Sequence, residues 1–153
     1  MLILCSVLFP IIAGVIASNV KTNTRARHIA YSLICAITDV LVILALSSKG
    51  SVTVVKFFEN VAFSFAVDDL GVFFLIAVML LFTAVLFYSF EYMKMEKNEE
   101  RFFGFYFVTF GAMIAMCMAE NPVTMYLCFE LLTLLSVPLV LHDETKEAVT
   151  AGL

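Results

Sequence analysis

The sequence has no tryptophan, only two histidines and few charged residues. Asp, Glu, Lys and Arg together make up 14% of its 153 residues, whereas a soluble domain carries about 25%. Hydrophobic residues reach 63% and the mean hydropathy is +1.04. This composition excludes a water-soluble enzyme and a disordered tail. The net charge is −4 and no Lys/Arg-rich run exists, which excludes nucleic acid as a partner. An integral membrane protein remains.

Several kinds of catalytic centre are also missing. The chain has no Gly-rich phosphate turn and no cysteines at the spacing of cluster or metal ligands, so we expect neither nucleotide nor iron–sulfur binding. His28 and His142 provide no facing pair for haem. The four cysteines fall in separate apolar stretches, where they serve as small apolar side chains: Cys5, Cys35, Cys117 and Cys128. We therefore expect no cofactor, no metal and no redox chemistry in this chain itself.

Five charge-poor stretches are long enough to cross a bilayer. A hydrocarbon core of roughly 30 Å needs about 20 helical residues. The predicted helices cover about residues 1–20, 29–48, 70–92, 102–119 and 122–141. The first stretch could instead be a signal peptide, but it has no basic residue before its apolar run and a poor cleavage site. We therefore favour a retained helix.

In the segment over residues 51–67, apolar residues do not form one long run but recur at the spacing of a β-strand. Apolar residues from Val61 to Val67 alternate with small or polar ones, which indicates a strand. A Val- and Phe-rich run over residues 51–58 precedes it, and Glu59-Asn60 separates the two. This predicts a small external β-hairpin. The expected fold class is an all-α integral membrane protein, with one membrane domain over residues 1–153 and the hairpin between helices two and three.

The distribution of Lys and Arg predicts the orientation of the chain. Seven of them fall on one side of the predicted topology and only two, Lys49 and Lys56, on the other. The seven are Lys21, Arg25, Arg27, Lys94, Lys97, Arg101 and Lys146. We expect a multi-pass protein of a prokaryotic cell membrane, with its N-terminus outside and its C-terminus in the cytoplasm.

One acidic residue, Glu130, lies near the centre of the fifth predicted helix. A carboxylate at bilayer depth costs about 2.5–3.5 kcal/mol on insertion scales, so it usually faces protein or water. Tyr126 lies four residues before Glu130 and Thr133 three after, which places all three on one helix face. Such a polar stripe suits a proton path. A neutral glutamate that joins a neighbouring helix by a hydrogen bond would give the same pattern, and both interpretations stay open.

A second acid, Asp39, lies inside the second predicted helix. Cys35 and Ser32, four and seven residues before it, form a weaker polar stripe. This favours a structural contact or a contact with another subunit over transport. No Lys, Arg or His lies near the middle of any predicted helix. A cation beside Glu130 must therefore come from a different polypeptide, unless ordered water takes its place.

The order of several short motifs resembles one family. The antiporter-like subunits of respiratory complex I, Mrp-type cation/proton antiporters and membrane-bound hydrogenases are similar at these positions. The motifs are VDDLGVFF at 67–74, YSFEYM at 88–93, RFF at 101–103, AEN at 119–121 and YLCFEL at 126–131. The resemblance is good from about residue 60 onward and extends only to the layout of the first 60 residues.

The resemblance implies a specific role for Glu130. In this family a glutamate of helix five gates proton movement in a half-channel and pairs with a lysine on a later, broken helix. Family members have about fourteen helices, so the chain would be the N-terminal part of a larger or split subunit. Other membrane subunits, one of which supplies a buried lysine, and the lipid bilayer would be its partners. Phe129 replaces a usual Trp and Asp69 a common Gly.

Three functional hypotheses follow. The first is a membrane subunit of a redox-driven or Mrp-type ion-translocating complex, in which Glu130 serves a proton or sodium half-channel. That complex would be a proton-pumping oxidoreductase of the NADH-quinone or hydrogenase type, or an antiporter. The second is a non-catalytic scaffold that docks neighbouring subunits through Asp39, Gly111 and Ala115. The third is a small proton-coupled transporter that uses Glu130 as a dimer.

Overall fold

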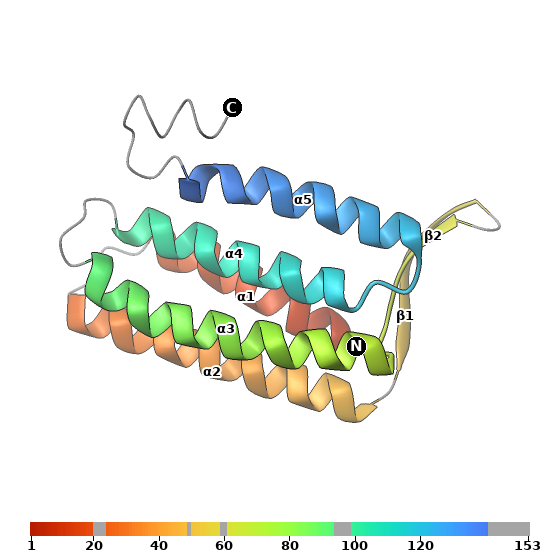
Figure 1. Cartoon of the computed structure of the whole chain (residues 1–153), viewed down its shortest axis with the longest axis horizontal. Coiled ribbons are helices and arrows are strands. Elements are labelled where there is room, and N and C mark those ends of the chain that lie inside the picture. Colours follow the sequence, from red (N-terminus) through yellow and green to blue (C-terminus); the bar gives the residue numbers. More distant parts are fainter. Residues whose placement is uncertain (20–23, 49, 59–60, 94–98, 141–153) are drawn as a thin grey trace.

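The computed structural model describes residues 1–19, 24–48, 50–58, 61–93 and 99–140. Five helices run side by side in alternating directions, and a two-stranded sheet lies at one end of the bundle (Figure 1). The helices are α1 (Leu2–Asn19), α2 (Thr24–Ser48), α3 (Asp69–Tyr92), α4 (Glu99–Cys117) and α5 (Pro122–Val140). All five are long and apolar enough to cross a membrane. The chain is thus a multi-pass, all-α membrane protein with a small hairpin, as its sequence predicts.

The hairpin consists of β1 (Ser51–Phe58) and β2 (Val61–Ala66), which pair antiparallel with Ser51 opposite Ala66. Two backbone bonds attach β2 to the connection between α4 and α5. The amide of Ala66 donates to the carbonyl of Met118 at 2.8 Å, and the amide of Glu120 donates to the carbonyl of Ser64 at 3.1 Å. The predicted turn residues Glu59-Asn60 lie outside the described residues.

Asn121 joins this attachment to the start of α5. Its amide nitrogen donates to the carbonyl of Ala62 at 2.7 Å and to the hydroxyl of Ser64 at 2.9 Å. Its side-chain oxygen accepts from the amide of Thr124 at 2.8 Å, which is the bond of a helix N-cap. One side chain thus sets where α5 begins relative to the sheet.

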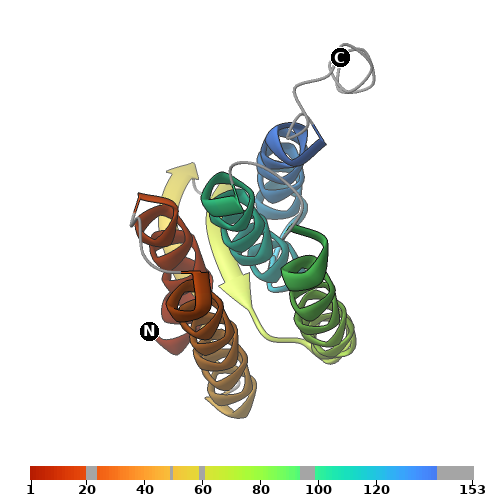
Figure 2. The same ribbon diagram turned by 90° about the vertical axis from the view of Figure 1, so that its left-hand side faces the viewer.

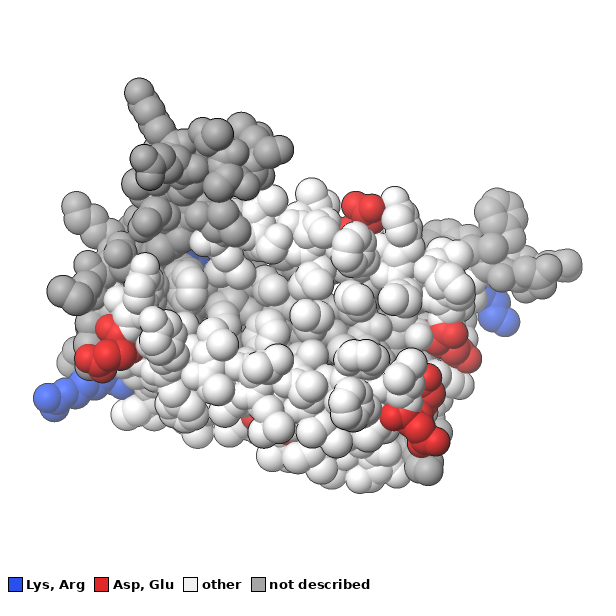
Figure 3. Space-filling model, viewed as in Figure 1, with Lys and Arg blue, Asp and Glu red and all other residues white. Residues whose placement is uncertain are grey.

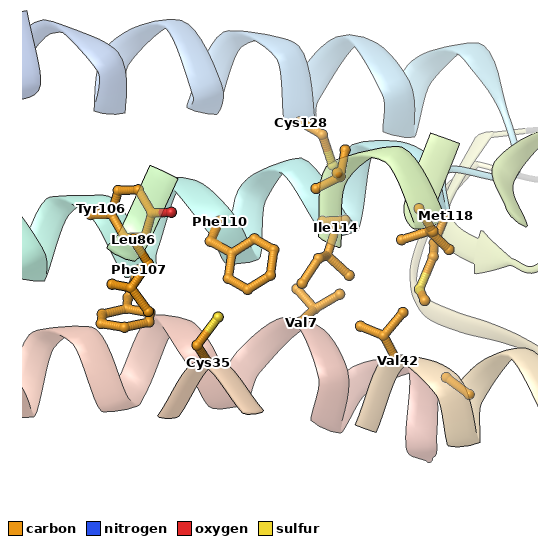
Figure 4. Packing of buried hydrophobic residues seen from close by; sticks show 14 of the residues in the cluster. Val7, Cys35, Val42, Leu86, Tyr106, Phe107, Phe110, Ile114, Met118 and Cys128 are labelled. Atoms are coloured by element: carbon orange, nitrogen blue, oxygen red, sulfur yellow. The ribbon is translucent and has the colours of Figure 1, made fainter. Parts of the chain in front are cut away.

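Helix α4 is the centre of the bundle. It contacts α1, α3 and α5, and the end-on view shows it between them (Figure 2). In its most apolar 18-residue stretch, 56% of the residues are buried, whereas in that of α5 only 11% are. Phe107, Phe110 and Ile114 of α4 pack against side chains of the surrounding helices (Figure 4). The large apolar surface left on α5 means that this helix is covered on one side only.

Glycines allow α1 and α4 to approach closely. A Cβ built at Gly14 would lie 2.7 Å from the Cβ of Phe107, and one built at Gly111 would lie 2.5 Å from Cγ1 of Ile11. Ala115 is also buried, at 5% exposure. The small-residue face that the scaffold hypothesis assigns to neighbouring subunits is therefore used inside the chain, with Gly111 against α1.

Two helices differ from the predicted bounds at their charged ends. The sequence predicts helices from about residues 29 and 102, whereas α2 begins at Thr24 and α4 at Glu99, and α4 ends at Cys117 instead of 119. A search for charge-free stretches stops at the first charged residue. Here the bases at the start of α2 pair with the acids at the start of α4, so both helices extend past the apolar region.

Candidate ion-translocation site

On the face seen in Figure 3, the surface between the two ends of the molecule is nearly free of charge. Charged side chains gather at the ends, and an acidic group interrupts the uncharged band over α5 (Figure 3). Glu130 is the one acid of α5, and it lies one residue from the middle of that helix. A membrane that covers the apolar band would therefore meet a carboxyl group at mid-depth on this face.

The buried face of α5 fixes the direction in which Glu130 points. Thr124 and Cys128 are 0% and 3% exposed, and Cys128 points from α5 toward Ile114 of α4 (Figure 4). Glu130 follows Cys128 by two residues, which is roughly 200° around a helix. It is accordingly exposed, as is Tyr126 at 60%. Within the described bundle Glu130 faces outward.

The predicted polar stripe lies on this outward face. The side chain of Tyr126 lies close enough to that of Glu130 to interact with it electrostatically. Thr133 is also exposed, but its hydroxyl donates to the backbone carbonyl of Glu130 at 2.8 Å and not to its carboxyl group. Tyr126 is thus the direct side-chain partner of the glutamate, while Thr133 stands beside it. No salt bridge joins Glu130 to a described residue.

Asp39 is placed differently, on the inner side of α2. The hydroxyl of Thr83 in α3 donates to its Oδ2 at 3.1 Å, and the thiol of Cys35 lies 3.5 Å from the same hydroxyl. The second carboxyl oxygen, Oδ1, is buried and has no partner among the described residues. Ser32, the other member of the predicted stripe, is half-buried and makes no side-chain bond to Asp39. Asp39 therefore connects α2 to α3 inside the membrane region.

An ionic cluster that sequence reasoning missed joins α2 to α4 at the end opposite the hairpin. Arg27 pairs with Glu99 at 2.7 Å and also with Glu100, and His28 lies 2.7 Å from Glu99. The side chains of Arg27 and Glu99 are only 14% and 11% exposed. Opposite charges at the facing ends of two predicted spans are the signal that could have found this cluster.

Thr83 is the other residue that sequence reasoning missed, since the sequence offers it only as one hydroxyl in an apolar span.

In the described part of the chain no group of three or more His, Cys, Asp or Glu could hold a metal ion. A hollow of about 350 Å³ between the hairpin and α5 is lined mainly by apolar side chains, including Phe63, Leu127 and Cys128. It offers no polar groups that would orient a cofactor.

Part of the chain is similar to a known family. Residues 56–103 match the family described as NADH-Ubiquinone oxidoreductase (complex I), chain 5 N-terminus. The match covers less than half of the chain and is consistent with the N-terminal region of an antiporter-like subunit. It confirms the resemblance seen in the motifs and supports a membrane subunit of a proton-translocating complex. Comparison with curated proteins gave no match.

The matched residues define how far this conclusion reaches. They include α3, part of the hairpin and the first turn of α4, and so three of the five motifs, VDDLGVFF, YSFEYM and RFF, lie inside the match. Both membrane acids, Asp39 and Glu130, lie outside it. The match thus supports the class of the protein through α3 and its flanks, while the roles of the two acids depend on their own surroundings.

Proposed function

We propose that the chain contributes Glu130 as the proton-carrying group of a half-channel in its membrane complex. The observation that supports this most directly is a carboxyl group at mid-depth on the uncovered face of α5, with Tyr126 beside it on the same face. In contact with lipid such a group would cost about 2.5–3.5 kcal/mol or more. Contact with further protein or a hydrated path removes most of that cost.

The partner that covers Glu130 supplies a positive charge in this proposal. No basic residue lies in the middle of any described helix, so the cation belongs to a helix outside the described bundle. A buried lysine fits, because its approach favours the ionised carboxylate and its withdrawal favours the protonated acid. Glu130 then binds and releases one proton as the lysine moves, and Tyr126 holds the carboxyl in position.

The decisive experiment is Glu130→Gln in the assembled complex. Proton pumping is followed in vesicles with a pH-sensitive dye, and assembly is followed by native electrophoresis. We expect Gln to abolish pumping through this half-channel while the complex assembles normally. Glu120→Gln is the matched control, because Glu120 is an exposed acid before the start of α5 and should leave pumping intact. Normal pumping by an assembled Glu130→Gln complex would contradict the proposal.

The scaffold hypothesis makes the opposite forecast for the same variant. It requires pumping to survive Glu130→Gln, while bulky residues at Gly111 or Ala115 release neighbouring subunits. Both small residues are buried inside the chain, so such variants should first disturb the packing of α4 itself. The small-transporter hypothesis requires the purified chain alone to bind a lipophilic cation in competition with protons.

A further inference from the structure

The interior of the bundle contains a second carboxyl group that the proposed function does not use. Asp39 lies within one turn of the middle of α2, so it is at a depth similar to that of Glu130 in α5. Its Oδ1 is enclosed by protein and has no described partner, and its Oδ2 accepts the Thr83 hydroxyl from α3. Oδ1 is thus removed from bulk water, while the residue as a whole is half-buried.

The groups around Asp39 determine whether it can be charged. On its own helix the titratable neighbour is Cys35, whose thiol lies beside the Thr83 hydroxyl at 3.5 Å. From α4, Tyr106 interacts electrostatically with both Asp39 and Cys35, and its hydroxyl donates to the carbonyl of Phe82 in α3. Helix α3 contributes Thr83. No described base forms a salt bridge with Asp39, and Arg27 is twelve residues away, or roughly 18 Å along the helix.

An ionised Asp39 would therefore hold a negative charge with one hydrogen bond and no cation, which is a costly state inside a membrane. A protonated Asp39 avoids this cost. Its Oδ2 still accepts from Thr83, and its hydroxyl hydrogen needs only one acceptor.

We propose that Asp39 is a second proton-binding residue of the membrane interior, held between α2, α3 and α4. At rest one carboxyl oxygen carries a proton. On release that O–H bond breaks as a water molecule takes the proton, and the carboxylate remains with the Thr83 hydroxyl as donor. Thr83 is a positioning residue that connects this site to α3. The proposal does not depend on the role of Glu130.

Infrared spectroscopy of the assembled complex tests the protonation state. The comparison is between Glu130→Gln and Glu130→Gln/Asp39→Asn, so that the acid of α5 is absent from both. We expect the second substitution to remove one carboxylic-acid C=O band that shifts in heavy water. Removal of carboxylate bands instead would overturn the proposal. If the Asn variant fails to assemble, Asp39→Glu serves in its place and should move the band instead of removing it.

Thr83 variants test the geometry of the same site. Thr83→Val removes the hydrogen bond to the carboxyl group and should move the band to higher frequency. Thr83→Ser keeps the hydroxyl and should leave the band in place, which makes it the matched control. Equal bands in all three forms would contradict the site as described.

A merely structural carboxyl group would also be protonated, so the last measurement concerns proton exchange. The Asp39 band should disappear reversibly as the pH is raised while the complex stays folded. A band that stays constant through the titration would show a structural hydrogen-bond donor and overturn the proton-binding role. Since Glu130 is absent from these samples, that result would leave the proposal for Glu130 untouched.

Discussion

The crossing of α1 and α4 offers a direct test of how the bundle is held together. A Cβ at Gly14 would lie 2.7 Å from the Cβ of Phe107 and 3.0 Å from the carbonyl oxygen of Gly104. Both neighbours belong to the buried face of α4, and Phe107 is 0% exposed. Neither can rotate away, so any side chain at position 14 has to push the two helices apart.

We expect Gly14→Val to lower the free energy of unfolding by about 2–3 kcal/mol. Overpacking a tight core costs about 1–3 kcal/mol, and this site belongs at the upper end because the clash involves the backbone. The better helix propensity of valine returns only about 0.3 kcal/mol. Gly14→Ala has the same Cβ but gains about 1 kcal/mol in propensity, so its loss should be smaller.

Unfolding can be followed with a thiol-reactive fluorophore in mixed micelles, because Cys35 and Cys128 are buried free thiols. Gly50→Ala is the matched control, since a Cβ there would meet only the carbonyl oxygen of Ser48, at 3.9 Å. If Gly14→Val and Gly50→Ala unfold at the same denaturant concentration, close contact between α1 and α4 does not stabilise the protein.

Two further predictions concern the ends of the bundle. Asn121→Ala should cost about 2 kcal/mol and speed amide hydrogen exchange in β2 around Ser64, because one helix cap and two bonds to the strand are lost; unchanged exchange would show that the sheet is attached by its backbone bonds alone. Glu99→Gln should lower thermal stability by about 1–3 kcal/mol, because it weakens a largely buried partner of Arg27. Asp69→Asn, an exposed acid near the hairpin, should have little effect, and an equal loss in both variants would remove the ionic cluster as the cause.

Hydropathy and the spacing of apolar residues were sufficient to predict the helices and the hairpin of this fold. Five apolar stretches gave five helices, and the alternation from Val61 to Val67 gave the second strand, because burial in lipid and pairing in a sheet each impose a repeat that one sequence displays. The helix ends at Thr24 and Glu99 were missed for a related reason. Their charges are neutralised across the bundle, and single-sequence reasoning treats each charge as if it were alone.

The residues that surround Asp39 and Glu130 could not be predicted from the sequence. Spacing placed Tyr126 and Glu130 on one face, but the side on which that face lies is set by Thr124 and Cys128, which pack inward. For Asp39 the partner is Thr83, 44 residues away, and no local pattern joins them. Periodicity along one helix shows which residues share a face. It does not show which other helix that face meets.

The contrast between these two acids argues for an interface on α5. Both lie near the middle of their helices, so lipid would penalise each of them similarly. Asp39 meets this constraint inside the chain, with one oxygen bonded to Thr83 and the other enclosed. Glu130 has only Tyr126, which is itself 60% exposed. A helix that packed no further could have reduced the cost by turning its acid inward, but Thr124 and Cys128 hold the opposite face against the bundle. The outward direction of Glu130 is therefore built into the packing of α5, and under the proposed function the next element of the complex approaches from that side with a polar or positively charged group.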